Sequence, residues 1–137
     1  MRFVIGILVL CLFPTGEIKA QEPEISGDWT MFEKTCISGD EVRVINEDQL
    51  RDQGLFTDYF FLPDKKLRLV TNMTGSGNLE TAEGTWTLEG DELICSIRVD
   101  ANLMDIVWGF EFRDDMIHLK RSFPDGSTSV VNSFKRK

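Results

Sequence analysis

Large aromatic side chains recur at alternate positions in the C-terminal half of this chain. Trp108, Phe110 and Phe112 alternate with other residues, and Trp86 stands in a similar alternating segment. Alternate residues of a β-strand point to the same face, so these four rings would share one apolar surface. Arg121 falls on the apolar side of a later segment. Such a surface beside a cation suits an apolar ligand with an acidic head group, and we predict these five residues as ligand-binding.

Side chains of the kind that catalyse reactions or bind metals are few and scattered. His118 is the only histidine, and it occupies a polar position within its alternating segment. With two cysteines beyond residue 20, it falls short of the usual ligand count of a zinc site. Residues 100–105 contain oxygen ligands but lack the glycine and distal glutamate of a calcium loop. No Gly-x-Ser-x-Gly motif or phosphate loop is present, so we expect no enzyme activity, metal or cofactor.

The first twenty residues differ from the rest of the chain. Arg2 precedes an apolar run over residues 3–13, and a small residue, Ala20, follows. This is the pattern of a secretory signal peptide, and the run is about half of the roughly 20 residues that a membrane-spanning helix needs. We therefore predict a signal peptide at 1–20 with cleavage after Ala20, a single domain at 21–137, no membrane span, and a secreted or periplasmic location.

The predicted domain is acidic. Residues 21–137 hold 13 basic and 22 acidic residues, which gives a net charge of −9, compared with −8 for the whole chain. A surface of this sign repels nucleic acids and anionic lipid head groups. We therefore expect no nucleic-acid partner.

Three cysteines stand in the chain. Cys11 lies within the predicted signal peptide, where lipid attachment is an alternative, although the preceding Leu10 is larger than the small residue such a site requires. In an exported protein, two cysteines are more often bridged than free, so we predict a disulfide between Cys36 and Cys95. Counting alternate residues from Trp29 puts Cys36 on the opposite face, so the bond requires a β-bulge or the end of the strand to turn Cys36 inward.

Alternation with a period of two dominates the chain after residue 26 and predicts β-strands. An acidic stretch at 37–54 interrupts it, and within this stretch Asn46 followed by two acidic residues predicts a short helix at 46–53. Eight antiparallel strands with short connections favour an up-and-down barrel, because closure removes the exposed edges. A two-sheet sandwich is the alternative, but it normally needs longer connections. The predicted strands begin at Trp29 and continue over residues 55–62, 67–74, 83–88, 93–99, 106–113, 116–123 and 128–135.

Three short segments form a recognisable set: Gly27-Asp28-Trp29 before the first strand, residues 84–93 (GTWTLEGDEL), and Ser133-Phe134-Lys135-Arg136 near the end of the chain. Together they resemble the lipocalin-like group of the calycin superfamily, in particular its small bacterial members. The first segment matches the Gly-x-Trp motif of that group, the second its central hairpin, and the third its closing strand. The resemblance covers nearly all of residues 21–137 and implies an all-β, eight-stranded antiparallel up-and-down barrel.

In that group the tryptophan of the first strand packs under an arginine of the last strand and closes one end of the barrel. The resemblance therefore implies that Trp29 is a structural plug beneath Arg136, with Arg121 as the alternative partner. An eight-stranded barrel is just wide enough either to be filled by its own side chains or to hold one small ligand. Both options stay open, because the aromatic rings either line a pocket or fill it. Arg121 likewise either binds an acidic head group, pairs with Glu33 or Glu111, or is simply exposed at the rim.

Two functions fit these observations. The first is a secreted or periplasmic lipocalin-like protein that binds a small hydrophobic or amphipathic molecule, such as a fatty acid, inside the barrel. The second is a protein-interaction or enzyme-inhibitor module, in which side chains fill the barrel and the stretch at 37–54 docks on a partner. Ligand-dependent tryptophan fluorescence would indicate the first, whereas loss of inhibition on changing that stretch would indicate the second.

Overall fold

The computed structural model describes residues 25–99 and 101–137, so the predicted signal peptide at 1–20, its cleavage after Ala20 and Cys11 lie outside the described residues. The described chain contains nine strands and one helix, and this helix is not long and apolar enough to cross a membrane. The elements are β1 (Gly27–Ser38), β2 (Glu41–Ile45), α2 (Glu47–Asp52), β3 (Thr57–Phe61), β4 (Lys66–Thr71), β5 (Glu80–Glu89), β6 (Glu92–Val99), β7 (Asn102–Arg113), β8 (Met116–Ser122) and β9 (Thr128–Arg136).

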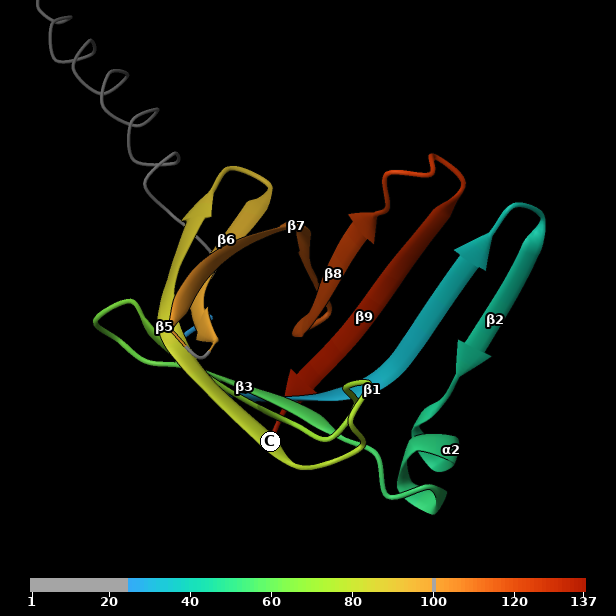
Figure 1. The fold of residues 1–137 in the computed structure, drawn as a ribbon, viewed down its shortest axis with the longest axis horizontal. Coiled ribbons are helices and arrows are strands. Elements are labelled where there is room, and N and C mark those ends of the chain that lie inside the picture. Colours follow the sequence, from blue (N-terminus) through green and yellow to red (C-terminus); the bar gives the residue numbers. More distant parts are fainter. Residues whose placement is uncertain (1–24, 100) are drawn as a thin grey trace, which may run out of the picture.

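Eight of these strands form a closed antiparallel barrel (Figure 1). From β3 to β9 each strand pairs with the next one along the chain, and β1 pairs with both β3 and β9 to complete the ring. The contact between β1 and β3 covers only Gly27–Thr30, whereas β1 follows β9 over nearly its whole length. The predicted up-and-down barrel is thus confirmed.

Strand β2 is an addition to the ring that is not predicted from the sequence. It turns back from β1 and pairs with residues 34–38, the part of β1 that β3 does not reach. Its alternation is short and lies within an acidic stretch, and Val42 and Val44 remain exposed. The predicted helix follows β2 rather than β1. Asn46 caps it, because its Oδ1 atom accepts a hydrogen bond of 2.9 Å from the backbone N–H of Gln49.

A β-bulge in β1 reverses which residues face the interior. The pairing between β1 and β9 shifts by one residue after Met31. Beyond the shift, Lys34 lies opposite Asn132, and Cys36 lies opposite Val130. Asn132 and Val130 are both buried, so the even-numbered residues of this half of β1 face inward. The bulge therefore supplies the inward turn that Cys36 was expected to need.

The predicted disulfide is nevertheless wrong, because Cys36 and Cys95 are free thiols. Cys36 lies on β1 and Cys95 on β6, and three strands separate β1 from β6 in either direction around the ring. The two cysteines therefore face each other across the barrel. A disulfide needs Cα atoms within about 7 Å, whereas opposite walls of an eight-stranded barrel enclose space for side chains.

One end of the barrel, which we call the floor, is closed by Trp29, Phe61, Trp86, Phe112 and Arg136. The guanidinium carbon of Arg136 lies 4.3 Å from the ring centroid of Trp29, which is fully buried. The indole N–H of Trp29 donates a 2.9 Å hydrogen bond to the carbonyl oxygen of Ile25. Gly27 has φ +130°, and a Cβ there would lie 3.0 Å from Nη1 of Arg136, so the glycine of the motif makes room for the arginine.

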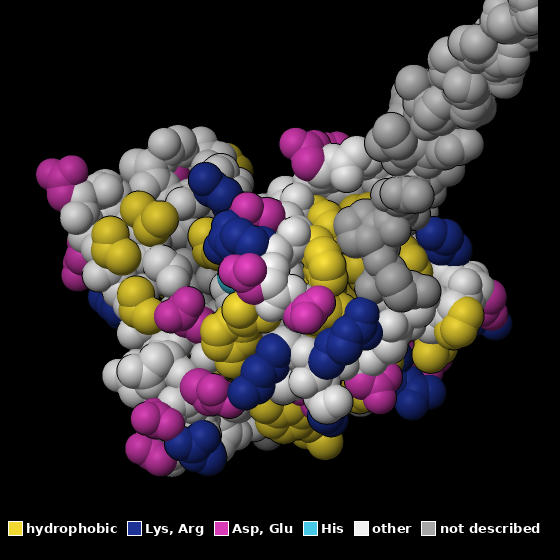
Figure 2. Space-filling view, turned by 180° about the vertical axis from the view of Figure 1, so that it is seen from behind, with side chains coloured by type: hydrophobic (Ala, Val, Ile, Leu, Met, Phe, Trp, Pro, Cys, Tyr) yellow, Lys and Arg dark blue, Asp and Glu magenta, His cyan; other side chains and the backbone are white. Residues whose placement is uncertain are grey.

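The outer surface mixes charged and apolar side chains. Figure 2 shows acidic and basic side chains interspersed with several separate hydrophobic patches on one face. Single exposed apolar residues are normal on soluble proteins. The large hydrophobic residues that are exposed include Val42, Val44, Leu62, Leu79, Leu103, Met104, Val107 and Phe123.

Candidate functional site

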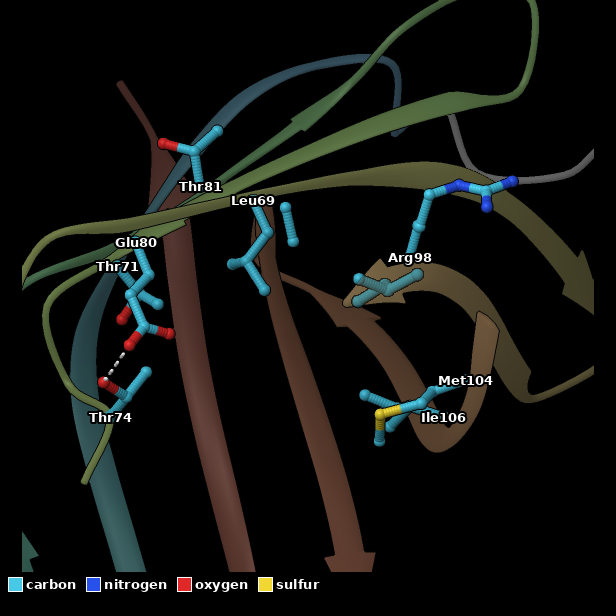
Figure 3. A pocket seen from close by; sticks show the side chains of 10 residues that line it. Leu69, Thr71, Thr74, Glu80, Thr81, Arg98, Met104 and Ile106 are labelled. Carbon is cyan, nitrogen blue, oxygen red and sulfur yellow. Dashed lines mark hydrogen bonds between the residues drawn. The ribbon is translucent and has the colours of Figure 1, made fainter. Parts of the chain in front are cut away.

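A pocket of about 560 Å³ opens at the end of the barrel opposite the floor, which we call the mouth. It lies where β4 ends, β5 begins, and β6 and β7 approach their connection. In Figure 3, Leu69 faces Met104 and Ile106 across the pocket. Its apolar lining consists of Leu69, Ala82, Ile97, Met104 and Ile106, and its polar lining consists of Thr71, Thr74, Glu80, Thr81 and Arg98.

The pocket lies where β5 extends beyond the end of β6. β5 pairs with β4 from its first residue, but its pairing with β6 begins only at Glu83, opposite Arg98. β6 ends one residue later, at Val99, so the first residues of β5 have no neighbour on β6, and Thr81 and Arg98 border the resulting gap. At Gly84 the two backbones approach so closely that a Cβ would lie 1.8 Å from the carbonyl oxygen of Ser96, and glycine permits this approach.

Polar side chains occupy the outer part of the pocket. Glu80 Oε2 accepts hydrogen bonds from Ser76 Oγ at 2.8 Å and from Thr74 Oγ1 at 3.2 Å. Arg98 lies on the other side of the pocket from Glu80 (Figure 3). The pocket thus has an apolar interior and a polar rim, which suits a molecule with both kinds of surface.

Between the mouth and the floor, the barrel encloses polar groups that carry no negative charge. Tyr59 is buried, and this burial raises the pKa of its hydroxyl. Burial also raises the pKa of the Cys95 thiol to about 12. Tyrosine and cysteine are ordinarily neutral at pH 7, and burial keeps these two groups neutral to higher pH. The Trp108 indole N–H and Asn132 Oδ1 are buried, and neither has a hydrogen-bond partner among the described residues.

The five predicted ligand-binding residues lie at different depths in the barrel. Trp86 and Phe112 belong to the floor, and Phe110 is buried in the core. Trp108 and Arg121 lie nearer the mouth, where the guanidinium carbon of Arg121 is 5.8 Å from the ring centroid of Trp108. None of the five lines the 560 Å³ pocket.

The residues that do line the pocket share a face with the predicted rings. On β7, Met104 and Ile106 continue the same alternating series as Trp108 and lie closer to the mouth. On β7, the pocket residues Met104 and Ile106 are smaller than Trp108. On β5, the pocket residue Ala82 is likewise smaller than Trp86, which lies nearer the floor. Small side chains leave space between the walls, so decreasing size along one face is the sequence signal for the pocket.

One hydrogen-bonded pair has the residue types of nucleophilic catalysis. His118 Nδ1 lies 2.8 Å from Ser133 Oγ, on the outer face of β8 and β9. A nucleophile must be reached by its substrate, but Ser133 is only 3% exposed. The geometry of this pair is that of a structural hydrogen bond.

No protein-family model matches the chain, and no curated protein does. Solved structures do resemble it. An uncharacterized protein from Bacteroides eggerthii superposes with a TM-score of 0.53 at 15% identity, covering 83% of this chain and 100% of that one. A lipocalin-like protein from Bacteroides uniformis superposes with a TM-score of 0.50 at 12% identity, covering 82% and 98%. The fold is a lipocalin-like barrel.

The fluorescent protein UnaG also aligns with this lipocalin-like barrel, with a TM-score of 0.44 at 10% identity, over 82% of this chain and 97% of that one. At such identities the likeness concerns the fold alone. The chemistry of the lipocalin-like barrel therefore has to be argued from its own residues, and its pocket is the starting point.

Proposed function

We propose that this protein binds a small hydrophobic or amphipathic molecule in the pocket at the barrel mouth. The pocket is the observation that carries the proposal. Its volume of about 560 Å³ lies within the range of roughly 300–1,000 Å³ that is typical of small-molecule sites. Its apolar walls favour a hydrocarbon chain or ring system, and its rim of hydroxyl and charged groups favours a ligand with one polar end.

The proposal includes export to a secreted or periplasmic location. The pattern of an N-terminal signal peptide at 1–20 supports it. A fatty-acid-like molecule is the ligand class we favour, because such molecules are poorly soluble and need a carrier outside a membrane. The pocket favours this function over the alternative of a partner-binding barrel filled by its own side chains.

A pair of tryptophan substitutions on β5 tests the site. Ala82 of β5 is the cross-strand partner of Leu69 on β4, and both line the pocket, so Ala82→Trp would fill much of the pocket volume. Thr85→Trp is the matched control, because Thr85 is exposed on the other face of the same strand. We expect the neutral fluorescent probe N-phenyl-1-naphthylamine to bind the wild type and Thr85→Trp alike, and Ala82→Trp at least tenfold more weakly.

Circular dichroism establishes that each variant keeps the barrel. Two results would contradict the proposal. One is the absence of probe binding by the wild type. The other is equal binding by a folded Ala82→Trp variant, because the pocket would then not be the site.

A further inference from the structure

Two cations face the barrel interior without a carboxylate partner among the described residues. Lys34 lies opposite Asn132 and Arg121 opposite Val130, and both of these β9 residues are buried on the inner face. The salt bridges of the described chain involve neither cation. Lys65, Arg98 and Lys120 also lie outside these ion pairs, so the distinctive feature of Lys34 and Arg121 is that both lie on the inner face of the sheet.

The glutamates expected as partners of Arg121 are directed elsewhere. Glu111 Oε2 lies 2.7 Å from Nη1 of Arg113. Because of the bulge in β1, Glu33 lies opposite Ser133, whose hydroxyl bonds to His118 on the outer face. Arg121 is exposed to solvent at the mouth, and its guanidinium carbon lies 5.8 and 5.9 Å from the ring centroids of Trp108 and Phe123.

The three tryptophans differ in what their indole N–H groups do. Those of Trp29 and Trp86 donate to the carbonyl oxygens of Ile25 and Leu62, at 2.9 and 3.3 Å. The N–H of Trp108 has no partner among the described residues, although Trp108 is only 8% exposed. Buried donors in folded proteins are nearly always paired, so this N–H remains able to donate to a bound ligand.

The unpaired donor and one cation converge on the same part of the interior. The charge of Arg121 and the indole N–H of Trp108 both act on the Tyr59 hydroxyl and oppose the rise in its pKa that burial causes. The indole N–H is therefore directed at the Tyr59 hydroxyl. Ile106, which precedes Trp108 by two residues on the same face, lines the apolar pocket. Trp108 is thus the next inward-facing residue of β7 after the pocket residue Ile106.

We propose that the ligand is an amphipathic anion whose carboxylate is held by Arg121, Lys34 and the indole N–H of Trp108 while its apolar part fills the pocket. This inference rests on the proposed function and specifies its ligand class. A carboxylate accepts charge-assisted hydrogen bonds from all three donors. Asn132, opposite Lys34, has an unpartnered acceptor, Oδ1. An acceptor favours a ligand with a neutral hydroxyl over one with a carboxylate. Comparing a carboxylate ligand with a hydroxyl ligand therefore distinguishes the two kinds of site.

Dodecanoate and dodecanol share a chain length and differ in head group, so their affinities test the proposal. Each is titrated at pH 7.5 against the wild type by displacement of N-phenyl-1-naphthylamine. We expect dodecanoate to bind at least tenfold more tightly than dodecanol. Arg121→Gln and Lys34→Gln should each weaken dodecanoate at least fivefold and leave dodecanol unchanged. Trp108→Phe, which keeps a ring and removes the N–H, should act in the same direction.

Lys120→Gln is the matched control. Lys120 is the neighbour of Arg121 on β8, is exposed on the outer face, and makes no ion pair with a described carboxylate. Lys120→Gln changes the net charge by the same amount as Arg121→Gln. An equal loss of dodecanoate affinity in both variants would mean that the protein's overall charge attracts the anion, and would overturn the site. Equal or tighter binding of dodecanol by the wild type would overturn the anion site and leave the pocket intact. No binding of either ligand or of the probe would overturn both proposals.

Discussion

The floor and the mouth of this barrel each contain a tryptophan beside an arginine, yet the two pairs differ in how their polar groups are used. At the floor, Trp29 is fully buried, its indole N–H is hydrogen-bonded, and Arg136 also donates to the carbonyl oxygen of Ser26 at 3.2 Å. Farther toward the mouth, the N–H of Trp108 makes no hydrogen bond that satisfies it among the described residues, and none of the described ion pairs involves the exposed Arg121.

The comparison separates closure from recognition. A polar group that is buried and paired stabilises the fold, whereas a buried group without a partner costs about 1–3 kcal/mol. Buried groups without a partner persist mainly at functional sites, where binding of a ligand satisfies them. The same two residue types therefore close one end of the barrel and, in our proposal, bind a ligand at the other.

The largest expected effect separates the two ends by stability. Trp29→Ala removes a fully buried indole and should lower the free energy of unfolding by about 3–5 kcal/mol. Met104→Ala removes a pocket side chain that is 48% exposed and should cost less than about 1 kcal/mol. Urea unfolding measures both. Similar losses for the two variants would contradict the distinction between a packed floor and an open mouth.

A smaller effect is expected beside the mouth. Gly84→Ala places a Cβ against the backbone of Ser96 and should destabilise the barrel by up to about 3 kcal/mol. Gly109→Ala is the control, because its nearest contact is Lys120 O at 3.5 Å, and its stability should change by less than about 0.5 kcal/mol. Urea unfolding again compares them. If Gly84→Ala were as stable as the wild type, the close approach of β5 and β6 would not require glycine.

The smallest effect depends on pH. Burial raises the pKa of Cys95 from 9.0 to about 12, so above pH 9 the unfolded chain loses this proton first and stability falls as pH rises. Between pH 8 and 10.5 the loss from this thiol should be about 2 kcal/mol. Cys95→Ala should reduce the difference in urea stability between the two pH values by this amount.

Leu93→Ala is the control for that measurement. Leu93 is buried on the same strand and does not titrate, so its variant should be destabilised equally at both pH values. An unchanged pH difference in Cys95→Ala would show that the thiol is not held neutral by the interior.

Much of the barrel could be predicted from the sequence because strand alternation and turn residues are local signals. The Gly27-x-Trp29 motif and Arg136 lie together as the resemblance implied, and the cap at Asn46 was readable from the residues that follow it. β2 was not predictable, because an exposed strand has no buried face to produce a contrast in hydrophobicity.

Alternation assigns a residue to a face but not to a position around the ring or along the axis. Alternation placed Cys95 inside the barrel but put Cys36 on the opposite face, and only the bulge in β1 turns Cys36 inward, on the far side of the ring from Cys95. The same limit applies to the predicted site, because Trp86 and Phe112 share a face with the pocket residues but lie at the floor. Only the three-dimensional structure shows which inward residues border empty space.

The most direct test follows the three indole N–H signals in a ¹H–¹⁵N NMR spectrum during titration with dodecanoate. Tryptophan-to-phenylalanine variants assign them. We expect the Trp108 signal to shift as its N–H gains a partner, while those of Trp29 and Trp86 stay in place because their hydrogen bonds at the floor already exist. A stationary Trp108 signal, or equal shifts of all three, would contradict a ligand site at the mouth.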